Sequence, residues 1–76
     1  MKDLVRTIAE ALVDEPEAVE VHEIEGDHSV LLELKVAKSD IGKVIGKEGR
    51  AAQSIRAIVS AAAQKAGRRA QLDILD

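Results

Sequence analysis

Two glycines separated by two residues lie near the middle of the chain, among side chains that carry positive charge. The segment reads Lys43-Val44-Ile45-Gly46-Lys47-Glu48-Gly49-Arg50. Glycine has no Cβ, so a turn built on such a pair can be tight, and its backbone can approach a ligand closely. Lysine and arginine beside that turn favour an anionic group such as phosphate. Because the spacing alone is a weak signal, the surrounding elements must support the interpretation.

The hydrophobic pattern predicts a helix and a hairpin before this segment. Apolar residues recur at helical spacing over 3–13, and Pro16 ends the helix. A strand follows over 19–24, where a break in strict alternation between Val21 and Ile24 predicts a bulge. After a turn at Gly26-Asp27-His28, clean alternation over 30–36 predicts a second, half-buried strand that pairs with the first.

The glycine pair is predicted to lie between two helices. The first is very short and contains Ile41, Val44 and Ile45, whereas the second begins at Arg50 and ends at Gly67. Alternation over 70–74 predicts a last strand. The order is therefore αββααβ in a single domain over residues 1–76. The apolar stripe expected along the long helix is Ile55, Ile58, Val59, Ala62, Ala63 and Ala66.

Charge is distributed unevenly along the chain. The net charge of −3 argues by itself against a nucleic-acid binder. Residues 1–34 carry two Lys or Arg and ten Asp or Glu, a net charge of −8. Residues 35–72 carry nine Lys or Arg and two Asp or Glu, a net charge of +7. The glycine segment lies in the basic part, although ordinary solvated charge explains such a split equally well.

Composition excludes several classes of site. The chain has no Phe, Trp or Tyr, so it lacks the aromatic platforms on which RRM and OB-fold modules stack bases. It has no cysteine, and His22 and His28 show no metal-ligand spacing. The serines have no G-x-S-x-G setting, and the glycine segment is not a P-loop. We therefore expect no enzyme activity, metal or cofactor.

Compartment and membrane association follow from the same composition. No segment approaches the ~18 apolar residues of a membrane span, and the first residues read as an amphipathic helix rather than a leader. The absence of cysteine suits a reducing compartment. We expect a soluble, unprocessed, cytoplasmic protein.

The whole chain resembles a KH domain. The signature of that family is an apolar pair, then G-x-x-G, then a helix with apolar residues at fixed offsets. Val44 and Ile45 match the apolar pair, Gly46-Lys47-Glu48-Gly49 the loop, and Ile55 the second helical offset. The order αββααβ matches the type II arrangement, an α+β fold in which a three-stranded mixed sheet packs against three helices. In length and loop sequence the chain is similar to the bacterial KhpA family of RNA-binding proteins.

The resemblance implies that the chain binds single-stranded RNA beside the glycine loop. It further implies a role as an RNA chaperone or post-transcriptional regulator that affects cell length and peptidoglycan homeostasis in a bacterium. It implies a homodimer or a complex with a larger KH-containing protein of the KhpB/Jag family, and no small-molecule substrate. The residues expected to contact RNA are Ile41, Gly42, Lys43, Val44, Ile45, Gly46, Lys47, Glu48, Gly49 and Arg50.

The physical account of such a site does not need the family name. The long helix begins at the loop, so its free N–H groups and positive dipole end favour phosphate. The aliphatic residues Ile41, Val44 and Ile45 offer a surface for unpaired bases, with strand 30–36 as the opposite wall. Ala52 stands where the family usually has a bulky aliphatic residue, which predicts a shallower groove.

Several residues allow more than one interpretation. Gly42 marks either close approach of nucleic acid or tight packing against the sheet. Ser39 or Asp40 is expected to cap the short helix. Arg68 and Arg69 follow the long helix, where capping its C-terminal end is the expected role. For Arg56, six residues after Arg50, the sequence leaves undecided whether its side chain lies on the same face of the long helix as the loop.

Two other functions remain open at this level. The Ala-rich long helix could serve an assembly module that presents Ala51, Ala57 or Ala61 to a partner. The groove could also accept single-stranded DNA, since only contacts to the 2′-OH distinguish the two nucleic acids.

Overall fold

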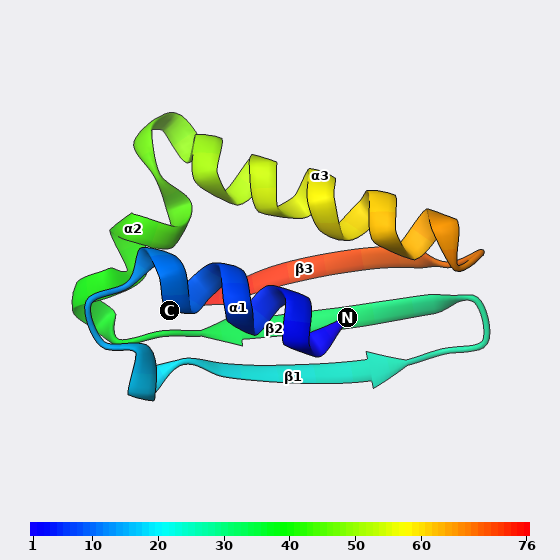
Figure 1. Ribbon diagram of the computed structural model, residues 1–76, viewed down its shortest axis with the longest axis horizontal. Helices are drawn as coiled ribbons and strands as arrows, with labels where there is room; N and C mark the ends of the chain where they lie inside the picture. The colour runs from blue at the N-terminus through cyan, green and yellow to red at the C-terminus, as the bar shows by residue number, and fades with distance from the viewer.

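The computed structural model describes residues 1–76 as three helices and a three-stranded sheet (Figure 1). The predicted α+β fold and the order αββααβ are both confirmed. Short 3-10 turns precede β1, α2 and α3. The bounds are α1 Lys2–Leu12, β1 Glu20–Glu25, β2 Ser29–Lys35, α2 Ile41–Ile45, α3 Arg50–Lys65 and β3 Arg69–Leu75, with the turns at Pro16–Ala18, Lys38–Asp40 and Lys47–Gly49.

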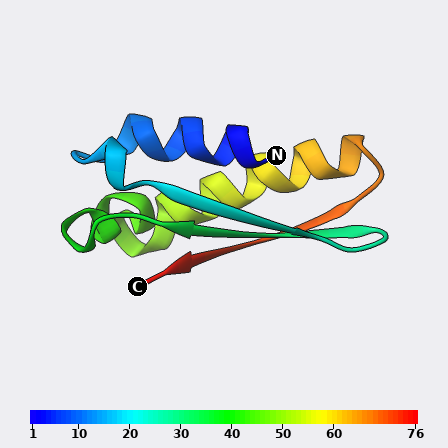
Figure 2. The ribbon, with the colours of Figure 1, turned by 90° about the horizontal axis from the view of Figure 1, so that it is seen from below.

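The sheet has the strand order β1-β2-β3, with β2 in the centre. β1 pairs with β2 antiparallel and β2 pairs with β3 parallel, so the sheet is mixed, as predicted. A parallel pair needs a crossover connection, which α2 and α3 supply. Figure 2 shows the helices on one face of the sheet and the other face uncovered.

An aliphatic core fills the space between the sheet and the long helices. On β2 the alternating residues Val30, Leu32 and Leu34 are buried, as the period of a half-buried strand requires. Helix α1 adds Val5 and Ala9, which are four residues apart and therefore share one face. Helix α3 adds Ala52, Ile55, Val59 and Ala63. This packing places α1 and α3 over the same face of the sheet.

Two details of the predicted elements are wrong. β1 contains no bulge, because its residues pair one to one with those of β2. Val21 faces the core, whereas Ile24 lies on the uncovered face with 56% of its surface exposed. On α3 the buried stripe is narrower than predicted, since Ile58 is 49% exposed and Ala62 and Ala66 are exposed as well.

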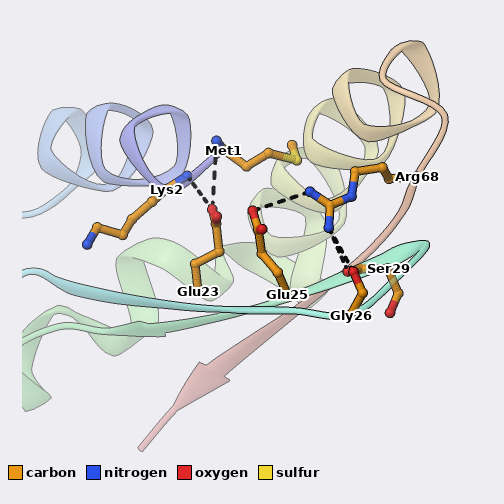
Figure 3. Close-up of polar contacts among 7 residues, drawn as sticks. All are labelled: Met1, Lys2, Glu23, Glu25, Gly26, Ser29 and Arg68. Carbon is orange, nitrogen blue, oxygen red and sulfur yellow. Dashed lines mark hydrogen bonds and ion pairs between the residues drawn. The ribbon is translucent and has the colours of Figure 1, made fainter.

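The side chain of Arg68 ties the end of α3 to the β1–β2 turn (Figure 3). Its guanidinium donates hydrogen bonds to the carbonyl oxygens of Gly26 at 3.0 Å and Ser29 at 3.2 Å. The same group pairs with Glu25 at 3.3 Å. Arg68 therefore holds the hairpin rather than the helix carbonyls that the sequence suggested.

The backbone closes α3 without help from either arginine side chain. The N–H of Arg68 donates to the carbonyl of Ala63 at 2.8 Å, and Gly67 adopts a φ of +74°. This is the left-handed geometry in which glycine commonly ends a helix, so the prediction for Gly67 is confirmed. The N–H of Arg69 instead donates to His28 at 2.9 Å, which continues the sheet.

The start of α1 is anchored to β1 through Glu23 (Figure 3). The carboxylate of Glu23 accepts a hydrogen bond from the backbone N–H of Lys2 at 3.0 Å and lies 3.8 Å from the ammonium group of Met1. A carboxylate at this end of a helix offsets the positive end of its dipole. The contact fixes α1 along the sheet.

Replacing Arg68 tests the hairpin anchor. We expect Arg68→Ala to lower the free energy of unfolding by about 1–2 kcal/mol, because two carbonyls lose a charged donor. Each kcal/mol corresponds to a Tm lower by about 4–8 °C in a domain of this size. Thermal unfolding measures the change, with Arg69→Ala as the control, since the side chain of Arg69 is exposed and surface substitutions shift stability by about 0.5 kcal/mol or less. Equal losses in the two variants would contradict the anchor.

Candidate nucleic-acid interface

The loop between α2 and α3 is built on left-handed backbone conformations. Gly46 has a φ of +78°, Gly49 a φ of +75°, and Glu48 a φ of +56°. A Cβ at Gly46 would lie 2.6 Å from the Cβ of Ala51, so glycine is required there for space as well as for conformation. A Cβ at Gly49 would meet nothing within 4 Å, so glycine is required there by φ alone.

Helix α3 begins at this loop without a side-chain cap, and of its first N–H groups that of Arg50 donates to the carbonyl of Lys47. Gly49 is the N-cap residue and makes no side-chain cap, and the first turn contains no acidic residue. The leading N–H groups of an uncapped helix and its dipole attract anions. The end of α3 at the loop is therefore electrostatically suited to a phosphate group.

The three cations of the loop region differ in how freely they can meet a ligand. Lys47 is exposed. Arg50 lies 3.8 Å from Glu48, but both side chains are mostly exposed, so this pair is weak. Lys43 is held more firmly, with its Nζ 3.2 Å from a carboxylate oxygen of Asp14. Lys47 and Arg50 are thus the cations best placed to contact phosphate.

Asp40 is the buried charged residue that positions α2. Its carboxylate accepts hydrogen bonds from the backbone N–H groups of Asp14 at 3.2 Å and Glu15 at 3.0 Å, and Lys43 lies 3.6 Å away. Burial alone would raise the pKa of Asp40, but the two N–H donors and Lys43 hold that pKa below its usual range. Asp40 is the N-cap residue of α2, one of the two positions predicted, but its side chain makes no capping hydrogen bond, because its carboxylate binds the connector after α1 instead.

The charge of Lys43 belongs to the same network. A hydrogen bond to Asp14 and the charges of Asp14 and Asp40 raise the pKa of Lys43. Lys43 thus joins α2 to Asp14, just after α1. The sequence alone did not predict this role. Its partner Asp14 is far away in sequence, and only the fold brings the two together.

The apolar residues of α2 divide between core and surface. Val44 is fully buried, so the expectation that it offers a surface to bases is wrong. Ile41 and Ile45 are half-buried and remain available. A Cβ at Gly42 would meet nothing within 4 Å, which excludes the tight packing against the sheet considered above. Gly42 leaves open space beside the loop.

A groove of about 390 Å³ lies between α3 and β3. The expectation that strand 30–36 forms the wall opposite the helix is wrong, because β2 is the central strand and β3 is the edge strand. Ala52 is buried, and of the apolar residues beside the groove Val59 and Leu72 are buried whereas Ala70 is half-buried. The lining residues are Arg56, Val59 and Ser60 from α3 and Ala70, Gln71 and Leu72 from β3.

Sequence reasoning missed this wall and left Arg56 unplaced. Gly49, Arg56 and Ser60 follow one another at intervals of seven and four residues, which places them on one face of a helix. That spacing was the available signal that Arg56 shares a face with the loop. Gln71 carried no comparable signal, since its place depends on which strand lies at the edge.

Comparison with known proteins identifies the family. A family model for the KH domain of KhpA/KhpB matches residues 2–74. The chain belongs to this family. Its αββααβ order and parallel β2–β3 pair are the type II KH arrangement, as the sequence resemblance implied.

Proteins named "RNA-binding protein KhpA" align with nearly the whole chain. That of Caldanaerobacter subterraneus subsp. tengcongensis is 59% identical over 75 residues, covering 99% of this chain and 100% of the relative. That of Clostridium acetobutylicum is 52% identical with the same coverage. That of Aquifex aeolicus is 46% identical, covering 100% of this chain and 96% of the relative. This KhpA/KhpB-family KH domain is not an enzyme.

Solved structures of Era share the fold. A variant of Aquifex aeolicus Era bound to GDP and aluminium fluoride superposes with a TM-score of 0.65 at 24% identity. Era in complex with MgGDPNP and nucleotides of 16S ribosomal RNA superposes with a TM-score of 0.59. Each match covers 96% of this chain but only 28% of Era, so it concerns the KH fold alone.

None of the helices combines the length and apolar character needed to cross a membrane. The structure also contains no group of three or more His, Cys, Asp or Glu side chains placed to hold a metal ion.

Acid titration tests the role of Asp40. Its pKa in the fold lies below the value of about 3.9 in an unfolded chain, so ionised Asp40 stabilises the fold above that pH, and this stabilisation is lost as the pH falls through the folded-state pKa. We expect Asp40→Asn to be less stable than the unsubstituted protein near neutral pH, with the difference shrinking below about pH 4.

Urea unfolding from about pH 7 to about pH 2 measures this difference. Asp14→Asn is the control, because the side chain of Asp14 is mostly exposed and its backbone N–H still reaches Asp40. A difference between the unsubstituted protein and Asp40→Asn that stays constant across the acid range would contradict the assigned role.

Glu48 offers a test of loop strain. A left-handed conformation costs a non-glycine residue about 1–2 kcal/mol, and asparagine tolerates it better than glutamate. We expect Glu48→Asn to raise the free energy of unfolding by about 0.5–1 kcal/mol, with loss of the exposed Arg50 pair having little effect. Lys47→Asn is the matched control at a neighbouring loop position without a positive φ. Equal shifts in both variants would show that the backbone at Glu48 is unstrained.

Proposed function

We propose that the chain binds a short single-stranded RNA segment through the Gly46–Gly49 loop and the groove between α3 and β3. The observation that carries the proposal is the loop itself. Its glycines let the backbone come close to a strand, and it leads into α3, whose start has no side-chain cap, beside Lys47 and Arg50. The names of the relatives, which denote RNA-binding proteins, support the choice of RNA.

The geometry favours a single strand over a duplex. A KH loop clamps about four nucleotides of backbone and leaves their bases unpaired beside it. Here the bases would lie against the half-buried Ile41 and Ile45 and, in the groove, beside the half-buried Ala70. Without aromatic rings, they are held by van der Waals contacts and hydrogen bonds to their edges. We therefore propose weak and modestly selective binding.

Fluorescence anisotropy of a labelled single-stranded RNA pool tests the proposal. We expect Lys47→Asp to weaken binding by about tenfold or more, because it places a negative charge where phosphate would lie. Lys2→Asp is the matched control, since it changes the net charge equally at the exposed start of α1. Circular dichroism checks that both variants fold. Equal binding by both variants would remove the loop from the site.

The salt dependence of the same titration gives an independent result. With two or three phosphates neutralised, the slope of log affinity against log salt should be about −1.4 to −2.1. A slope steeper than about −4 would mean a much larger phosphate footprint than this loop can provide. Matched DNA strands show whether the 2′-OH takes part.

The cellular roles that the resemblance implies form the finer part of the proposal. Weak binding of short single strands suits an RNA chaperone or post-transcriptional regulator in the cytoplasm. Through its RNA targets such a protein would act on cell length and peptidoglycan homeostasis. A larger KH-containing protein of the KhpB/Jag family is the proposed partner.

Self-association is a second candidate function, favoured by one observation. Ile58 on α3 is 49% exposed, and Ala57, Ala61 and Ala62 around it are exposed as well. Sedimentation velocity of the unsubstituted protein and Ile58→Asp tests this face. We expect association to be lost in the variant, because assembly would bury a charge in an apolar contact. An unchanged sedimentation profile would exclude this face as the contact.

A further inference from the structure

Arg56 binds a backbone carbonyl, whereas three other arginines of the chain bind carboxylates. Arg6, Arg50 and Arg68 each pair with a glutamate. Arg56 forms no ion pair; its Nε instead donates a hydrogen bond to the backbone carbonyl of Leu72 at 3.1 Å. Its positive charge is therefore not neutralised by the protein.

The bond to Leu72 fixes the orientation of a planar group. Guanidinium carries five N–H donors in a rigid fork, and the Nε–H accounts for one of them. The two terminal nitrogens of Arg56 make no hydrogen bond within the protein, and the residue is exposed. Their N–H groups thus form a pre-oriented pair of donors held by the edge strand.

These donors lie on the wall of the groove. Arg56 lines it together with Ser60 from α3 and with Gln71 and the half-buried Ala70 from β3. Along α3, Arg56 lies two turns beyond Gly49 on the same face, about 10 Å from the loop. A strand whose backbone is held at the loop can therefore place a base in the groove beside Arg56.

We propose that Arg56 selects guanine at this position of the groove. Guanine presents two adjacent acceptors, O6 and N7, that match the fork of an arginine, whereas adenine replaces O6 with the N6 amino donor. Uracil and cytosine have no N7 acceptor. This inference rests on the proposed RNA-binding function and adds a base preference to it.

Competition between labelled short oligoadenylates tests the preference. Three strands carry a single substituted base at the centre, which is guanine in the first, inosine in the second and 7-deazaguanine in the third. The all-adenine strand is the reference. We expect the guanine and inosine strands to bind about 5- to 10-fold more tightly than the all-adenine strand, because both keep O6 and N7. The 7-deazaguanine strand, which lacks N7, should lose most of that gain.

Arg56→Lys separates selection from charge and packing. Lysine keeps the positive charge but not the planar fork held by Leu72, so the ratio of guanine to all-adenine affinity should fall, whatever the change in overall affinity. Arg69→Lys is the matched control on the neighbouring strand and should keep the preference. A purely structural role for Arg56 would change thermal stability without changing the ratio of affinities.

The outcomes separate this inference from the function on which it rests. If the unsubstituted protein binds the strands equally, or the 7-deazaguanine strand keeps the full gain, guanine selection by Arg56 is overturned and RNA binding stands. If the unsubstituted protein binds none of the strands, both are overturned. The comparison of guanine with 7-deazaguanine uses the unsubstituted protein, so it decides the question even if Arg56→Lys fails to fold.

Discussion

The contact between Gly46 and Ala51 sets the geometry on which the rest of the structure depends. A Cβ at Gly46 would lie 2.6 Å from that of Ala51, so α3 can begin this close to the end of α2 only with glycine between them. The chain then turns within a few residues and runs back over the sheet (Figure 1). The end of α3 at the loop and the α3 side of the groove therefore belong to one helix, which this turn orients.

The fold also separates the two parts of the sequence that differ in charge. The acidic first part of the chain contributes α1 and the edge strand β1, whereas the basic part contributes α2, α3 and the start of the opposite edge strand β3. The net charge of −3 therefore averages over helices and strands of unlike charge. Two long-range contacts hold these edges in place: Asp40 fixes α2 to the end of α1, and Arg68 fixes the end of α3 to the hairpin.

Local patterns in the sequence predicted the order of elements and the glycine loop, because periodicity and glycine placement are local properties, whereas the mixed sheet followed from the resemblance to the KH family. The roles of Asp40 and Arg68 could not be predicted, since their partners are more than 20 residues away in sequence. The wall of the groove was assigned to β2 because alternation identifies a strand but not its position in a sheet. The same limit left Val44 on the surface in the prediction, although it is fully buried in the fold.

In the proposed complex, single-stranded RNA lies across the loop and along the α3–β3 groove. Backbone amide NMR of the labelled protein, titrated with a short single-stranded RNA, tests this placement residue by residue. We expect chemical-shift changes to concentrate at residues 46–50 and to continue through 56–60 and 70–72. Shifts concentrated on β1, or on the uncovered face of the sheet around Ile24 and Leu31, would contradict it.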